Sequence, residues 1–288
     1  MHRLGLIGTQ SGHAASFATI AAGHRDRFSF ISAWDKDSEN AAAFCERFGI
    51  PRQAGLPEQM KGEVDAVMIT ARDGASHAEL ALPFLEAGIP VWVDKPFSIS
   101  PEDADIMLHA AKRGKAILAG GSNLKYCPSV KRAKALADRL RKEDQLLSAS
   151  FNFQALINSP YHGLHFYGPH SIDILLTVFG RDISGLSCRM VKGGAVAVFD
   201  MTDISVTANL IDCWDAKLTA YTPQRAISLS IGLHRLHENG MKAFIDMIEG
   251  SRPAQSAQSL LDPVVLMNAM IRSMESGGAL ISNPLSSL

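Results

Sequence analysis

Lys95 lies in the stretch "VWVDKP", residues 91–96, and its position suggests chemistry at an oxygen atom. The apolar run "VWV" predicts a buried strand, so Lys95 follows the carboxyl end of that strand, where parallel sheets bind ligands. Pro96 restricts the backbone of Lys95 to extended conformations, and Asp94 is its candidate charge partner. An ammonium group fixed there could stabilise a developing alkoxide or tune a neighbouring acid. The opposing interpretation is that Asp-Lys-Pro is an ordinary loop tripeptide.

Histidines are concentrated in "YHGLHFYGPH", residues 161–170. A histidine titrates near neutral pH, so one of them could take up and return a proton during catalysis. We expect His170, at the start of a predicted helix, to be this group, with His165 as the second choice. Asp173 lies one turn further along the same face of a regular helix, where it could hold the imidazole of His170. His165, Asp173 and Tyr126 are also our candidates for contacts with a substrate.

Two other interpretations of these histidines are open. His162, His165 and His170 could ligate a metal ion, although no cysteine or carboxylate nearby completes the set. We therefore predict no metal site. Alternatively, His162 and His165 only hydrogen-bond the backbone of a loop.

The segment "GLIGTQSGHAASF", residues 5–17, predicts a turn that binds a phosphate group. Gly8 permits a tight turn from strand to helix, and the helix N-terminus then presents free amides to an anion. A dinucleotide-binding fingerprint has glycines where Gln10 and His13 stand, and Gly12 is displaced by one residue from the last of them. Gln10 must therefore turn its side chain away or donate it to a phosphate. The alternative is a strand-to-helix turn without a ligand.

Asp35 strengthens the interpretation of this turn as a cofactor site. It ends the second predicted strand, where a carboxylate can accept both ribose hydroxyls of NAD and repels the 2′-phosphate of NADP. The adjacent Lys36 weakens that preference, and "DKDSEN", residues 35–40, could instead be a polar loop with a helix cap. We predict NAD as the cofactor. The positions expected to hold it are Gly8, Thr9, Gln10, Ser11, Gly12, His13, Asp35, Lys36, Thr70, Ala71, Arg72, His77, Asp94 and Lys95.

Within this set, His13 and His77 stand at predicted helix starts. The helix dipole favours a neutral imidazole there, so we expect mainly structural roles for both.

The elements that position these residues differ between the two halves of the chain. Strand and helix patterns alternate over residues 3–120, which predicts a doubly wound parallel sheet. Residues 122–288 carry a series of strand-like runs, one interrupting helix near 168–180 and two closing helices. That pattern predicts an α+β domain with a mostly antiparallel sheet. We place the boundary between a Rossmann domain at residues 1–121 and this second domain at residues 122–288.

Composition excludes several classes of partner. The chain has 288 residues, of which 47% are hydrophobic, and a formal net charge of -1. No global attraction to nucleic acid or to an anionic membrane follows, and we predict neither partner. The four cysteines are widely separated and form no CxxC pair, which suits a reducing compartment. With no signal-peptide pattern and no apolar stretch of membrane-spanning length, we expect a cytoplasmic protein.

The order of the motifs resembles the Gfo/Idh/MocA oxidoreductase family of glucose–fructose oxidoreductase and inositol dehydrogenase, over almost the whole chain. "VDAVMITARDGASHAELALPFLEAGIPVWVDKPFS" is similar to the family's strand, Thr-Pro turn, His-led helix and strand ending in Glu-Lys-Pro. "AGGSNLKYCPSVKRAKAL" resembles its crossover segment, "GPHSIDILLTVFG" its Gly-x-His-x-x-Asp helix, and "FIDMIEGSRP" with "SLLDPVVLMNAMIRSMESGGAL" its closing helices.

This resemblance implies nicotinamide-dependent hydride transfer on a hydroxyl or carbonyl carbon, commonly of a sugar, a polyol or a small hydroxy acid. By the same resemblance, Lys95 corresponds to the lysine of Glu-Lys-Pro and binds the reacting oxygen, and His170 corresponds to the acid/base histidine. The resemblance also implies that residues 1–121 form a dinucleotide-binding domain and that residues 122–288 form a substrate-binding and oligomerisation domain with an open sheet. Open sheets in the family commonly pair face to face, which implies a homodimer or a higher homo-oligomer.

Three departures from the family pattern affect this interpretation. Phe166 stands where the family usually has an aspartate four residues before the histidine, and a phenyl ring cannot orient an imidazole. Asp94 replaces the usual glutamate. Arg72 replaces part of the Thr-Pro turn; it could pair with a phosphate or a carboxylate, although we favour a solvated loop charge.

The leading hypothesis is an NAD-dependent oxidoreductase acting on CH-OH groups. The first alternative is a catalytically weakened protein of the same fold that binds a dinucleotide or a sugar derivative, in which Phe166 records lost chemistry. The second is a lyase or hydrolase that runs an internal redox cycle on a tightly held cofactor.

Overall fold

The computed structural model describes residues 1–286, and the chain divides into two compact units. The first unit contains residues 1–121 together with 237–260, and the second contains residues 122–236 and those from 261 onward. The first break coincides with the boundary predicted from the sequence. The segment 237–260, which the prediction placed in the second domain, packs with the first unit instead.

The first unit is built on a six-stranded sheet with the order β3-β2-β1-β4-β5-β6, and all of its strand pairs are parallel. This 3-2-1-4-5-6 order is the doubly wound Rossmann arrangement, as predicted. The strand that precedes Lys95 is fully buried, as parallel strands covered on both faces are. The strands are β1 (His2–Ile7), β2 (Phe28–Trp34), β3 (Arg52–Gln53), β4 (Ala66–Ile69), β5 (Val91–Val93) and β6 (Leu118–Gly120).

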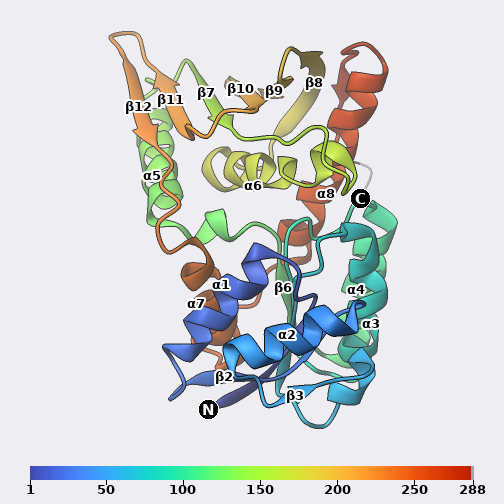
Figure 1. Ribbon diagram of the computed structural model, residues 1–288. Coiled ribbons are helices and arrows are strands. Elements are labelled where there is room, and N and C mark those ends of the chain that lie inside the picture. Colours follow the sequence, from blue (N-terminus) through green and yellow to red (C-terminus); the bar gives the residue numbers. More distant parts are fainter. Residues whose placement is uncertain (287–288) are drawn as a thin grey trace. The chain divides into compact units, whose positions relative to one another are not determined.

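Helices connect these strands, and α3 and α4 lie side by side (Figure 1). Local sequence explains where they begin: α4 starts at Pro101, and the side chain of Ser100 accepts the amide of Asp103. The helices of this unit are α1 (Gly12–Ala22), α2 (Ser38–Phe48), α3 (His77–Glu86), α4 (Pro101–Gly114) and α7 (Leu236–Ile248), with the short 3₁₀ helices η1 (Pro57–Met60) and η2 (Gly74–Ser76).

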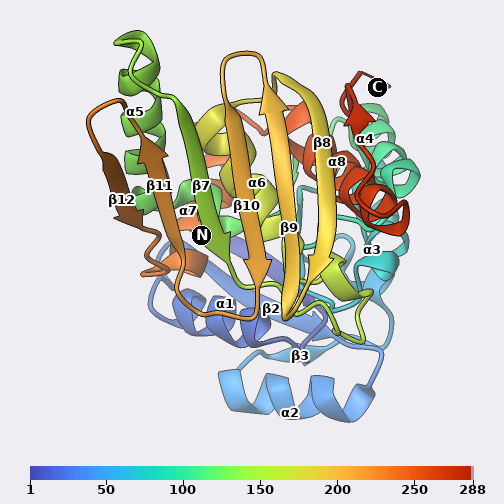
Figure 2. The same cartoon turned by 90° about the horizontal axis from the view of Figure 1, so that it is seen from above.

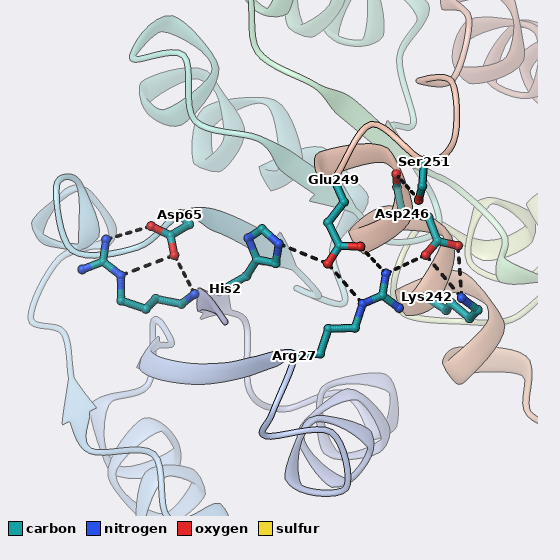
Figure 3. Close-up of polar contacts among 8 residues, drawn as sticks. His2, Arg27, Asp65, Lys242, Asp246, Glu249 and Ser251 are labelled. Atoms are coloured by element: carbon teal, nitrogen blue, oxygen red, sulfur yellow. Dashed lines mark hydrogen bonds and ion pairs between the residues drawn. The ribbon is translucent and has the colours of Figure 1, made fainter.

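Helix α7 is attached to the first unit by apolar and charged contacts. The rings of Trp92 and Phe244, both fully buried, have centroids 5.8 Å apart, and such aromatic burial supplies most of the stabilisation. At the surface, Arg27 pairs with Asp246 at 2.7 Å and also with Glu249 (Figure 3). These partly exposed ion pairs contribute less free energy to stability than the buried rings do, but they fix how the helix is attached.

The second unit contains a seven-stranded sheet with the order β12-β11-β7-β10-β9-β8-β13. Its strand pairs are antiparallel except for β7 with β10 (Figure 2). The mostly antiparallel sheet predicted from the sequence is therefore confirmed, with one parallel pair. The strands are β7 (Ser148–Phe153), β8 (Ile183–Val191), β9 (Gly194–Met201), β10 (Ser205–Ile211), β11 (Lys217–Tyr221), β12 (Ala226–Ser230) and β13 (Ile281–Ser282).

Helix α6 covers one face of this sheet, where it contacts β7 and β10 and packs beside α5 (Figure 2). It begins at Gly168, where an added Cβ would lie 2.7 Å from the sulfur of Met267. Glycine therefore allows α8 to approach the start of the helix that carries His170. The helices of this unit are α5 (Pro128–Lys142), α6 (Gly168–Phe179) and most of α8 (Ala257–Glu275), with η3 (Asn123–Tyr126) and η4 (Gly163–His165). In the described part of the chain, no helix combines the length and the hydropathy needed to cross a membrane.

Candidate active site

The turn after β1 is fixed against the end of β4. Gly8 has φ +89°, and an added Cβ would lie 2.4 Å from the backbone nitrogen of Ala71. The hydroxyl of Thr70 donates to the carbonyl of Gly8 at 2.6 Å. Ser11 then caps α1 by accepting the amide of Ala14 at 3.0 Å. Only glycine fits this turn, which leads directly into the helix N-terminus.

Asp35 is buried at the end of β2 and accepts hydrogen bonds from the same turn. One carboxylate oxygen accepts from the amide of Thr9 at 2.6 Å and from its hydroxyl at 3.1 Å. The other accepts from the amide of Asp37 at 3.0 Å and from the side-chain amide of Gln10 at 3.3 Å. The Gln10 side chain therefore turns toward Asp35, one of the two orientations that the sequence left open. Lys36, the next residue, is exposed.

At the end of β5, Asp94 forms a buried pair with His13. Oδ2 of Asp94 lies 2.5 Å from Nδ1 of His13, whose ring has its centroid 4.3 Å from that of His237 in α7. Burial opposes ionisation of Asp94, but the neighbouring charges of His13 and Lys95 outweigh it and lower its pKa to about 2. Burial and the proximity of His13 lower the pKa of His237 to about 4. At neutral pH, an ionised carboxylate and a neutral imidazole therefore flank His13.

Lys95 is buried directly after Asp94, with only 5% of its surface exposed. Burial lowers its pKa to about 8; Asp94 opposes this shift and Arg72 adds to it. Arg72 itself is exposed at the end of the neighbouring strand. A lysine with this pKa can exchange a proton near neutrality.

His77 has a structural position. It is fully buried, and its Nε2 lies 2.9 Å from the carbonyl of Ala71. Burial lowers its pKa, so the ring is neutral and secures the loop after β4.

In the second unit, His170 is buried and its Nδ1 lies 2.6 Å from the hydroxyl of Ser122. Asp173, one turn along α6, does not hold this ring as the helix spacing suggested. One of its oxygens pairs with Lys125 at 2.9 Å, and the other accepts the amide of Ser122 at 2.8 Å. Asp173 thus secures the segment before α5, and Ser122 contacts the imidazole.

Phe166 lies in an aromatic group beside His170. Its ring centroid is 5.3 Å from those of Tyr161 and Tyr167, and Tyr167 meets His170 edge-on at 5.4 Å. His165 is half-buried, and burial together with His162 lowers its pKa to about 4. His165 is consequently neutral at physiological pH. Tyr126 is buried in η3.

The structure thus brings most predicted cofactor positions together at the carboxyl edge of the first sheet, while Lys36 and Arg72 are exposed there. The candidate substrate residues Tyr126, His165, His170 and Asp173 all belong to the second unit. Sequence reasoning missed Ser122, Lys125 and His237; the first two lie next to the predicted boundary, but nothing in their spacing pairs them with residues of α6. Over residues 1–286, no cluster of three or more histidine, cysteine or acidic side chains is arranged to hold a metal ion.

The residues of the first unit fit a dinucleotide. Gly8 lets the turn pass in close contact with the backbone of Ala71, and the first amides of α1 follow this turn. Asp35 is held in place at the end of β2, but four protein donors already reach its oxygens. The longest of these contacts is the one from Gln10, at 3.3 Å.

A parallel sheet of this order, with a glycine turn after β1 and an acidic residue ending β2, defines a dinucleotide-binding Rossmann unit. Residues 2–122 match the family model GFO_IDH_MocA, described as an oxidoreductase family with an NAD-binding Rossmann fold. This part of the chain is therefore similar to the Gfo/Idh/MocA family, and the resemblance inferred from the motifs is confirmed over these residues. The family description also agrees with NAD as the predicted cofactor.

Known relatives extend the similarity to the whole fold. A putative UDP-kanosamine synthase oxidoreductase subunit of Amycolatopsis mediterranei is 32% identical over 34% of this chain and 27% of its own length. A crystal structure of GenD2 from gentamicin A biosynthesis in complex with NAD has a TM-score of 0.85 at 16% identity, covering 98% of this chain and 96% of that one. Scyllo-inositol dehydrogenase from Lactobacillus casei, solved with NAD(H) and scyllo-inositol, has a TM-score of 0.82 at 14% identity, covering 98% and 99%. The first three curated relatives are matched over at most 40% of their length.

Proposed function

We propose that this chain is an NAD-dependent oxidoreductase that transfers a hydride between the nicotinamide and a hydroxyl or carbonyl carbon of a sugar, a polyol or a small hydroxy acid. The observation that carries the proposal is Lys95, a buried lysine at the carboxyl end of β5 in a Rossmann unit. Burying an ammonium group is costly, so such a residue is a candidate for chemistry. The relatives named above, which include a polyol dehydrogenase solved with its substrate, support the substrate class.

The residues of the turn after β1 would hold the cofactor. The amides at the start of α1 would bind the pyrophosphate, and Asp35 would accept the ribose hydroxyls after the side chain of Gln10 withdraws. The carboxylate of Asp35 repels a 2′-phosphate, so we propose NAD rather than NADP. When bound, the nicotinamide supplies or accepts the hydride.

The chain itself supplies the groups that act on the reacting oxygen. Lys95 and His170 are our two catalytic residues: one donates a hydrogen bond to that oxygen, and the other exchanges the proton that accompanies hydride transfer. Lys95 belongs to the first unit and His170 to the second. The ionised Asp94 beside Lys95 stabilises the charged form of that lysine and so raises its pKa.

A titration with NADH, followed by tryptophan emission, tests cofactor binding, because Trp34 directly precedes Asp35. Saturable quenching is expected, and a weaker response to NADPH would support the role of Asp35. The absence of any response from folded protein would refute the proposal.

Turnover is tested on a panel of polyols, sugars and sugar acids with Lys95→Ala, His170→Ala and the control Lys112→Ala, which removes an exposed lysine of α4 in the same unit. Activity is expected to fall by at least about a hundredfold in the first two variants and to persist in the control. Unchanged turnover in both catalytic variants would exclude these residues from the reaction.

Light scattering on the same samples tests the homodimer or higher homo-oligomer that we also propose.

Phe166 favours a second candidate function, a protein of the same fold that binds a dinucleotide or a sugar derivative without turning it over. The aromatic group around Phe166 replaces the carboxylate that the family usually places before its histidine. Saturable NADH binding without turnover of any compound in the panel would favour this candidate.

A further inference from the structure

The hydrogen bond between Ser122 and His170 joins two buried side chains of the second unit. Ser122 is fully buried, and His170 is 4% exposed. Their 2.6 Å contact, from Oγ to Nδ1, is short for a neutral hydrogen bond. Phe166 stands where the family has a carboxylate, and Asp173 is occupied by Lys125 and the amide of Ser122. The hydroxyl of Ser122 is the polar group that lies at Nδ1 of this ring.

The direction of that hydrogen bond follows from the other contacts of Ser122. The amide of Leu124 donates to Oγ of Ser122 at 3.2 Å, so this oxygen already acts as an acceptor. The carboxylate of Asp173 accepts the backbone amide of Ser122 rather than its hydroxyl. Among residues 1–286, Nδ1 of His170 is the one acceptor in reach of the hydroxyl proton. A buried hydroxyl proton without an acceptor would be costly, so this proton points at Nδ1.

We propose that Ser122 is a positioning residue that donates its hydroxyl proton to Nδ1 of His170 and holds the imidazole as the tautomer with its proton on Nε2. A neutral ring in this state can donate a hydrogen bond from Nε2 but cannot accept a proton there. His170 is then the donor to the reacting oxygen, and Lys95 exchanges the proton. This assignment rests on the proposed function and reverses the roles that the family resemblance implied.

The step balances with these roles. In the direction of reduction, a hydride from NADH, which is thereby oxidised to NAD, adds to the carbonyl carbon and the π bond of the carbonyl breaks. The oxygen takes a proton from the ammonium group of Lys95, which becomes a neutral amine, while Nε2–H of His170 donates to that oxygen throughout. In oxidation, the amine of Lys95 takes the hydroxyl proton. The pKa of Lys95, lowered by burial to about 8, suits this exchange near neutrality.

Nitrogen NMR of the whole chain, labelled with 15N in its histidine rings, tests the tautomer without any need for activity. The signals of His170 are assigned by their loss in His170→Gln. We expect the wild-type protein at mildly alkaline pH to carry its proton on Nε2, with Nδ1 shifted by a hydrogen bond. Ser122→Ala should move the Nδ1 signal toward that of an unbonded nitrogen. Ser129→Ala is the matched control, because it removes another buried hydroxyl of this unit, one that donates to the carbonyl of Gly232.

A proton on Nδ1 in the wild-type protein would overturn the inference, as would an Nδ1 signal that Ser122→Ala leaves in place. The wild-type spectrum shows which nitrogen of His170 carries the proton, even if Ser122→Ala does not fold. Because these measurements need no substrate, they separate the failure of this inference from the failure of the proposed function.

The division of roles is tested by kinetics. The side-chain amide that His170→Gln introduces can donate a hydrogen bond but cannot exchange a proton. We therefore expect His170→Gln to stay within about tenfold of the wild-type kcat, whereas His170→Ala loses about 10²–10³-fold. Equal losses in the two variants would show that His170 is the acid/base and would refute the assignment to Lys95.

Discussion

Gly8→Ala tests whether the turn after β1 has any freedom to relax. Two effects act against the new methyl group. The backbone of Gly8 has φ +89°, a region that costs an L-residue about 1–2 kcal/mol. The added Cβ would also lie 2.4 Å from the nitrogen and 2.6 Å from the Cα of Ala71. These atoms belong to the backbone of the chain just after β4, so no side-chain rotation relieves the contact, and overpacking of this kind costs about 1–3 kcal/mol.

The sum is a loss of about 2–5 kcal/mol in the free energy of unfolding. Urea denaturation followed by tryptophan emission measures it, because Trp34 and Trp92 both report on the first unit. NADH titration of the folded variant is expected to show weakened binding as well, since the same turn leads into the amides that would hold the pyrophosphate.

Gly12→Ala is the matched control for this experiment. Gly12 is the first residue of α1 and is exposed, and an added Cβ there meets no atom within 4 Å. The stability of this variant should equal that of the wild type or exceed it slightly, because alanine is the better helix residue. If Gly8→Ala unfolds at the same urea concentration as Gly12→Ala, the turn relaxes freely and the reasoning is wrong.

Three further predictions concern charged groups of the first unit. The pKa of Lys95 lies at about 8 in the folded chain and 10.5 in the unfolded one, so the unfolded state binds more protons between these values and stability rises with pH across that window. Lys95→Met should therefore be more stable than the wild type at neutral pH, and thermal melts should show this advantage shrinking toward pH 10.5. Asp35→Asn should lower the free energy of unfolding, measured by urea denaturation, by about 1.5–3 kcal/mol, since it places a side-chain NH₂ among the hydrogen-bond donors around Asp35. An unchanged urea midpoint would show that these hydrogen bonds do not stabilise the fold. Arg27→Met should lower stability by at most about 1 kcal/mol, because the ion pairs of Arg27 are partly exposed. A larger loss in the same assay would contradict the view that these ion pairs contribute little.

Local signals explain which parts of the fold could be predicted from the sequence. Ser100 with Pro101 marks the start of α4, and buried apolar runs such as residues 91–93 mark parallel strands. Such features act over a few residues, so the pattern of the chain contains them. The two-residue strands β3 and β13 carry too short a pattern to be recognised.

Contacts between distant residues could not be predicted in the same way. The amphipathic pattern of α7 is compatible with packing on either sheet, and the choice is made by partners such as Trp92 for Phe244. Likewise, helix periodicity places His170 and Asp173 on one face, but it cannot show that Ser122 reaches the imidazole first. For the candidate site, residue types and strand ends could be predicted, whereas the hydrogen-bond partners depend on tertiary packing.

The return of residues 237–260 to the first unit has a consequence for how such a protein can be divided or recombined. A gene fragment ending at residue 121 would encode all six strands of the first sheet but would leave Trp92 without Phe244 and the amide of Gly120 without the side chain of Gln255. Exchanging the nucleotide-binding unit with that of a relative would require a crossover on each side of a retained middle segment, and a further one after residue 260. A single crossover therefore cannot exchange one unit and leave the other intact.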